Sequence, residues 1–113
     1  ACRDFGYATE YVEWIWNIMQ YPVADDFVIA TGETHSVKEF VQLAFEVAGI
    51  YNWEDYVEYD KTLARPAEVD LLMGDASKSK RLLGFEPKIR FRELVKIMVN
   101  SELQKLIPVE KFY

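Results

Sequence analysis

The sequence predicts a helix-rich α/β fold in one domain, because amphipathic helical periods alternate with a short apolar run. The clearest helix lies at 36–48, where Ser36 and Glu39 form a Ser-x-x-Glu capping box ahead of apolar residues spaced by three and four. Gly49 follows this helix in the position that favours a left-handed backbone. The apolar run Phe-Val-Ile-Ala at 27–30 predicts a buried strand. A chain of 113 residues has room for one domain, 1–113.

The remaining elements follow from the same patterns. A second short strand is predicted at 56–59, where Tyr-Val-Glu-Tyr alternates apolar and polar positions. Three further helices are predicted, each followed by a residue that breaks helices. They lie near 9–20, before Pro22; near 76–83, before Gly84; and near 91–106, before Pro108.

Composition narrows the possible partners and compartment. The net charge of −6 argues against nucleic acid or an anionic membrane as the main partner. The only cysteine, Cys2, cannot form an internal disulfide and fits a reducing compartment, so we expect a cytoplasmic protein. No apolar run is long enough to span a membrane. Aromatic residues make up 15% of the chain, and we expect an exposed face around Trp14 and Trp16 to drive homo-oligomer formation.

The stretch that begins Arg65-Pro66 carries the clearest chemical signal. Proline disfavours the helical region at Arg65, so its guanidinium can present a planar set of donors that suits a phosphate. Glu68 and Asp70 follow at a spacing that can reach sugar hydroxyls. An arginine that can bind phosphate, followed closely by carboxylates that can bind ribose hydroxyls, predicts nucleotide binding. A solvated loop of mixed charge is the alternative interpretation of these residues.

Three blocks of the sequence, in the same order, resemble the C-terminal third of the GDP-mannose 4,6-dehydratases. This family belongs to the extended short-chain dehydrogenase/reductase group. The first block is Arg-Asp-Phe-Gly-Tyr-Ala at 3–8, where Phe5 replaces the tryptophan of the family's segment. The second is the apolar run and its link to the next helix at 27–37, and the third is Arg-Pro-Ala-Glu-Val-Asp-Leu-Leu-Met-Gly-Asp at 65–75. The resemblance covers nearly the whole chain.

The resemblance implies a function for several residues. It places diphosphate-binding arginines at Arg3 and Arg65 and a ribose-binding carboxylate at Glu68. It implies that the parent enzyme uses NADP to convert GDP-mannose to GDP-4-keto-6-deoxymannose. For Asp4, Asp70 and Asp75 we expect structural roles as caps and backbone hydrogen-bond acceptors.

The sequence lacks the nicotinamide-binding motifs of that group. It has no Gly-x-Gly-x-x-Gly, and no tyrosine is followed by lysine four residues later. We therefore expect a fragment without the Rossmann half, with no catalytic residue, no bound cofactor and no activity by itself. We expect it to bind a GDP-sugar weakly. The only histidine, His35, has no nucleophile or metal ligand at a suitable spacing, so we expect a structural role and no metal site.

Two other functions fit the same residues. The chain can be a non-catalytic α/β module that binds a protein partner or its own copy, or part of another nucleotide-sugar epimerase or reductase of the same group. The cations of the 76–83 helix can suggest an anion site. They surround the helix instead of sharing one side, so we interpret them as a solvated face.

Overall fold

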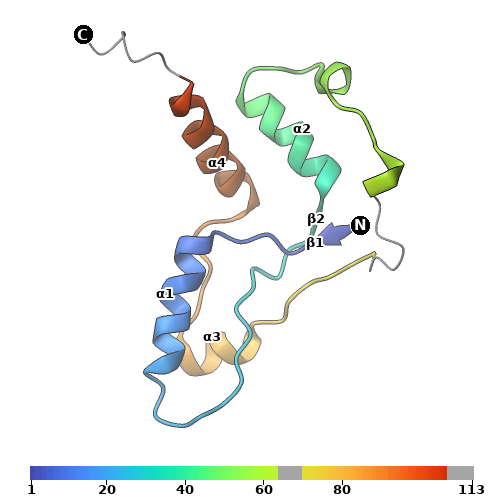
Figure 1. Cartoon of the computed structure of the whole chain (residues 1–113). Helices are drawn as coiled ribbons and strands as arrows, with labels where there is room; N and C mark the ends of the chain where they lie inside the picture. The colour runs from blue at the N-terminus through green and yellow to red at the C-terminus, as the bar shows by residue number, and fades with distance from the viewer. Residues whose placement is uncertain (64–69, 107–113) are drawn as a thin grey trace, which may run out of the picture.

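A computed structural model describes residues 1–63 and 70–106. In this part of the chain, α2 and α4 pack together at one end, α1 and α3 lie at the other, and a two-stranded antiparallel sheet lies between (Figure 1). The elements are β1 (Cys2–Arg3), α1 (Ala8–Met19), β2 (His35–Ser36), α2 (Val37–Val47), η1 (Trp53–Tyr56), η2 (Lys61–Leu63), α3 (Ser77–Leu83) and α4 (Phe91–Lys105).

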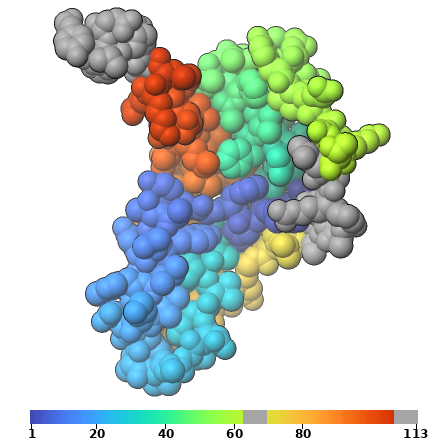
Figure 2. Space-filling view, viewed as in Figure 1, coloured from blue at the N-terminus to red at the C-terminus, as the bar shows by residue number. Residues whose placement is uncertain are grey.

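The molecule is flat and open. Its extents are 51 × 47 × 21 Å and its radius of gyration is 17.8 Å, against about 13 Å for a compact domain of this length. The space-filling view shows two lobes joined through the region of β1 (Figure 2). Each lobe therefore buries only a small core of its own.

The capping box that the sequence predicts at the start of α2 is present. The Ser36 hydroxyl accepts a hydrogen bond from the Glu39 N–H at 3.1 Å, and the Glu39 carboxylate accepts one from the Ser36 N–H at 3.1 Å. Gly49 follows the helix with φ +83°, the left-handed conformation that glycine adopts without steric cost. Local chemistry thus fixes both ends of α2.

The first lobe has its core between α2 and α4. Leu43 from α2 packs with Phe91 and Val95 from α4, and the Val95 side chain is fully buried. Phe5, between β1 and α1, adds its ring to this cluster at 5.2 Å from Phe40 and 6.0 Å from Phe91. The N-terminal segment is therefore part of the α2–α4 core.

The second lobe forms where α3 meets α1. Phe85, directly after α3, is 1% exposed and meets the Trp14 ring edge-on, with 5.2 Å between ring centroids. Ser79 is fully buried in α3, and its hydroxyl donates to the Val28 carbonyl at 2.6 Å. Gly84 ends α3 at φ +73°, as the sequence predicts.

One buried carboxylate joins the two lobes. Glu10, in the first turn of α1, is 8% exposed and accepts hydrogen bonds from the Lys88 N–H at 2.5 Å and the Ile89 N–H at 3.1 Å. The link before α4 is thus held against α1. The position of Glu10 in the first turn indicates only an interaction with the positive end of the α1 dipole. Its two N–H partners lie 78 and 79 residues away, beyond the reach of sequence patterns.

The helix-rich α/β class is confirmed, and the four predicted helices are present within one or two residues of their expected bounds. The two predicted strands are wrong. Residues 27–30 are irregular because side chains, instead of a neighbouring strand, bond the backbone here. The Ser79 hydroxyl donates to the Val28 carbonyl, and the Asp4 carboxylate accepts from the N–H of the next residue, Thr31. Within the described residues, 27–30 has no strand partner.

The prediction at 56–59 fails for a different reason. Trp53–Tyr56 folds as a 3-10 turn in which the Asn52 side chain bonds Asp55 at 2.9 Å, so the alternating run begins inside a turn.

Among residues 1–63 and 70–106, no helix combines the length and apolarity needed to cross a membrane.

We expect Glu10→Gln to lower the free energy of unfolding by about 1–3 kcal/mol, because the amide offers one acceptor oxygen where two N–H donors now find a carboxylate. Urea unfolding at pH 7 measures the effect. Glu13→Gln, on the same helix but exposed, is the matched control and should change stability little. Equal stabilities for the two variants would contradict the role assigned to Glu10.

Candidate functional site

β1 brings the candidate residue Arg3 into the middle of the molecule. It pairs antiparallel with β2, with Cys2 opposite Ser36 and Arg3 opposite His35. Residues opposite one another in an antiparallel pair share a face of the sheet. The Arg3 side chain therefore lies on the same face of this small sheet as the imidazole of His35.

The other edge of β1 contacts residues 70–72, which belong to the block 65–75. The Cys2 N–H donates to the Asp70 carbonyl at 2.6 Å, and the Leu72 N–H donates to the Cys2 carbonyl at 3.0 Å. A parallel bridge joins Cys2 and Leu71. Residues nearly 70 positions apart in the sequence are thus paired beside Arg3.

Arg3 itself is half-buried, and its Nη1 donates to the Cys2 carbonyl at 2.8 Å. The other two predicted binding residues, Arg65 and Glu68, lie outside the described residues. The surface beside Arg3 is hollowed into an open depression of about 390 Å³. Its lining residues are Arg3, Asp4, Val28, Ile29, Ala30, Leu72, Met73 and Gly74.

The carboxylate of Asp4 joins three chain segments beside Arg3. It accepts hydrogen bonds from the Thr31 N–H at 3.0 Å, the Thr31 hydroxyl at 2.5 Å, the Gly32 N–H at 2.9 Å and the Gly74 N–H at 3.2 Å. Burial favours the neutral acid, but these four hydrogen bonds outweigh it and hold the pKa of Asp4 below its ordinary value of 3.8. Asp4 is therefore ionised at neutral pH.

Gly74 allows this close approach. A Cβ built on Gly74 would overlap the Cβ of Ala30, so the two backbones come together only because position 74 lacks a side chain. The expected structural roles of Asp4 and Asp75 are confirmed. Asp75 accepts a hydrogen bond from the Ser77 N–H at 3.0 Å, at the start of α3.

His35 lies in a packed, hydrogen-bonded environment. Its ring stacks on Phe91 with 3.8 Å between centroids and 9° between planes, and its Nδ1 lies 3.0 Å from the Glu39 carboxylate. Hydrogen bonds from His35 and Ser36 lower the pKa of Glu39. These contacts agree with a structural role. Among the described residues, no cluster of three or more His, Cys, Asp or Glu side chains is arranged to hold a metal ion.

Another depression, of about 450 Å³, lies beside α2 and α4 and is lined in part by His35. Three glutamates line it, and only two arginines oppose their charge. The carboxylates outnumber the guanidinium groups here, which makes this surface unfavourable for a diphosphate. The charged lining residues are Glu33, Glu39, Glu46, Arg90 and Arg92.

Helices and a small sheet in an open, flat outline define a small, helix-rich α/β fold. The family described as GDP-mannose 4,6 dehydratase matches residues 1–98. The chain is 51% identical to GDP-mannose 4,6 dehydratase 1 of Arabidopsis thaliana, over 92% of this chain and 28% of that protein. It is 41% identical to the Dictyostelium discoideum enzyme (99% and 36%) and 39% identical to the human one (92% and 32%).

The chain belongs to the GDP-mannose 4,6-dehydratase family. It spans about a third, or somewhat less, of the length of these three relatives. The family resemblance predicted from the three sequence blocks is thereby confirmed.

The lowered pKa of Asp4 predicts a specific dependence of stability on pH. A carboxylate with a depressed pKa in the folded state contributes stability above its unfolded value of 3.8, and this contribution is lost as pH falls through the folded value. We expect Asp4→Asn to be less stable than wild type at pH 7 and the difference to shrink below pH 3.8. Urea unfolding at pH 7 and pH 3 measures both.

Asp60→Asn is the matched control, because Asp60 also accepts the N–H and hydroxyl of a threonine, but only two residues away and on the exposed surface. Its effect at pH 7 should be smaller. A stability difference between Asp4→Asn and wild type that is the same at both pH values would show that the Asp4 charge does not matter.

Proposed function

We propose that this chain is the GDP-sugar-binding part of a GDP-mannose 4,6-dehydratase-like enzyme, a lyase that converts GDP-mannose to GDP-4-keto-6-deoxymannose. One observation carries the proposal. Cys2, next to Arg3 in β1, pairs with residues 70–72. Residues 70–72 belong to the block 65–75, so part of this block lies beside the strand that carries Arg3.

The chemistry of the proposed site is that of a nucleoside diphosphate. Arg3 and Arg65 neutralise the diphosphate, since guanidinium groups donate two hydrogen bonds at a time to phosphate oxygens. Glu68 accepts hydrogen bonds from the ribose hydroxyls. The depression beside Arg3 has apolar walls from Val28 and Leu72, against which a sugar or base can rest.

The remaining steps of the reaction belong to the rest of the enzyme in this proposal. NADP serves the parent enzyme in the cytoplasm, bound by a Rossmann half, which is the partner of this chain. Hydride transfer needs a bound nicotinamide and an acid/base group. The sequence has no motif for the first and no tyrosine–lysine pair for the second, so we propose that the isolated chain does not turn over GDP-mannose.

GDP should bind the isolated chain with an affinity in the millimolar range, because only part of the site is present and each missing charge-assisted contact weakens binding by about 1.5–3 kcal/mol. Arg65→Lys keeps the charge but loses the planar set of donors, so it should weaken binding further. An NMR titration with GDP measures both. We expect shifts at residues 65–68 and at Arg3.

Arg81→Lys is the control, since Arg81 lies exposed on α3, away from β1. It should leave the titration unchanged. Shifts confined to the basic residues 78–81, together with no effect of Arg65→Lys, would refute the proposed site.

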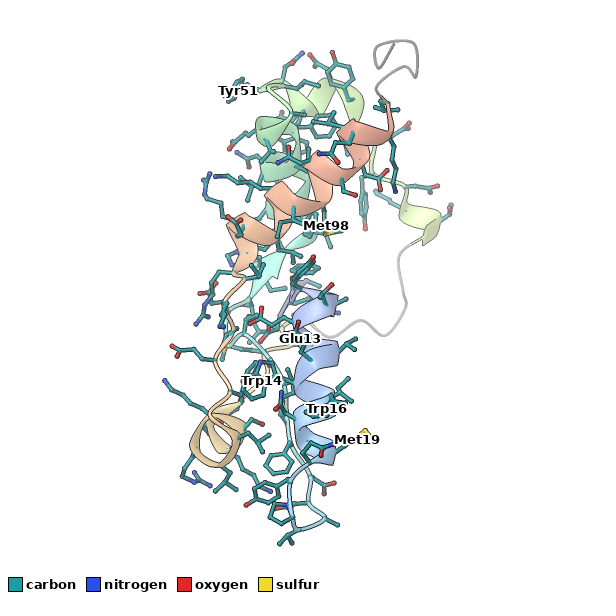
Figure 3. All side chains as sticks on the ribbon, turned by 90° about the vertical axis from the view of Figure 1, so that its left-hand side faces the viewer. Glu13, Trp14, Trp16, Met19, Tyr51 and Met98 are labelled. Atoms are coloured by element: carbon teal, nitrogen blue, oxygen red, sulfur yellow. The ribbon has the colours of Figure 1, made fainter. Side chains whose placement is uncertain are left out.

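A self-associating module is the second candidate function, and the exposed face of α1 favours it. Val12, Ile15, Trp16 and Met19 are 53–75% exposed, with the spacing of one helical face. In Figure 3, Trp16 and Met19 project from one side of α1 while Trp14 lies on the other. Trp14, also expected on the open surface, instead packs on Phe85.

Such an apolar face should drive association of the isolated chain with itself. Sedimentation velocity over a range of concentrations should show dimers or larger species, and Trp16→Glu should shift them toward monomer. Tyr51→Glu introduces the same charge at an aromatic residue that is 78% exposed beyond the far end of α2, and should leave association unchanged. A monomer at every concentration would exclude this second function. No feature of the described residues favours the epimerase or reductase alternative.

A further inference from the structure

We propose that Asp4 is a positioning residue of the nucleotide-sugar site, which holds Arg3 in register with residues 70–74. This inference rests on the proposed function for its ligand. The geometry that supports it, however, is independent of any ligand. It concerns the residue next to Arg3 and the three chain segments that its carboxylate joins.

Arg3 is held by hydrogen bonds on both sides along the chain. On one side, the Cys2 backbone pairs with Asp70 and Leu72. On the other side, the Asp4 carboxylate continues the same connection by accepting the Gly74 N–H at 3.2 Å. The segment 70–74 is therefore attached both before and after Arg3, once by backbone and once by a side chain.

The same carboxylate attaches Arg3 to the other neighbouring segment. It accepts the Thr31 N–H and hydroxyl and the Gly32 N–H, just before β2. β2 in turn pairs with β1 through Arg3 and His35. A displacement of Asp4 would thus remove one of the two attachments to each neighbouring segment and leave only the backbone pairing of β1.

Only a carboxylate satisfies this arrangement. Its two oxygens accept from three N–H groups and one hydroxyl, and the negative charge strengthens each bond. Asparagine has one acceptor oxygen, and its NH₂ group would face N–H donors. Asp4→Asn is therefore a nearly isosteric change that should loosen the connection specifically.

The central contacts of the first lobe do not include the Asp4 carboxylate. Leu43, Phe91 and Val95 pack between α2 and α4 through apolar contacts. Loosening the Asp4 connection should therefore leave the amides of these two helices protected. Unchanged protection of α2 and α4 would therefore distinguish a positioning role of Asp4 from a general loss of structure.

The test is hydrogen exchange by NMR on wild type, Asp4→Asn and Asp60→Asn, followed by titration of each with GDP. In Asp4→Asn we expect faster exchange at the Cys2 and Leu72 amides, which do not touch Asp4, with unchanged protection in α2 and α4. We expect the GDP affinity to fall about tenfold, a difference of about 1.4 kcal/mol. Asp60→Asn should match wild type in both measurements, because its Thr62 contacts are local.

Unchanged exchange at Cys2 and Leu72 in a folded Asp4→Asn chain would overturn the proposal, as would an unchanged GDP affinity. If Asp4→Asn fails to fold, Thr31→Val removes one of the four bonds and should give the same pattern more weakly. A wild-type chain that shows no GDP-induced shifts would contradict the proposed function. Faster Leu72 exchange in Asp4→Asn would then still support the positioning of Arg3.

Discussion

The carboxylate of Asp4 is the constraint on which the middle of this structure depends. The two-residue strands between the two lobes contribute few backbone hydrogen bonds. Asp4 compensates by accepting four hydrogen bonds from Thr31, Gly32 and Gly74, all with one charged group. Ionic hydrogen bonds of this kind tolerate partial exposure, where a small apolar cluster would not suffice.

Glu10 has a comparable role at the edge of the second lobe. Its carboxylate accepts two backbone N–H groups from the link that leads into α4. Acidic side chains thus connect helices that do not pack closely on one another. The outer face of α1 stays uncovered in this arrangement. The hydrogen bonds to Asp4 and Glu10 explain how a molecule only 21 Å thick keeps its elements in place.

What could be predicted from the sequence depends on the range of the interactions involved. α2 was predictable because Ser36, Glu39 and Gly49 act within a few residues of its ends. The strands were not, since a strand exists only with a partner, and the backbone pairing of Cys2 with residues 70–72 is set by tertiary contacts. Among the candidate site residues, Arg3 lines an open depression and its binding role stays a prediction, while Arg65 and Glu68 lie outside the described residues.

The stacking of His35 on Phe91 has a consequence for spectroscopy. With 3.8 Å between the ring centroids and nearly parallel planes, the carbon-bound imidazole protons lie within the shielding region of the phenyl ring current. Because the chain has a single histidine, those resonances occur once in the spectrum and need no assignment strategy. The proton chemical shifts of His35 therefore report on the junction of β2 and α2 with α4, because they change with the separation of the two rings.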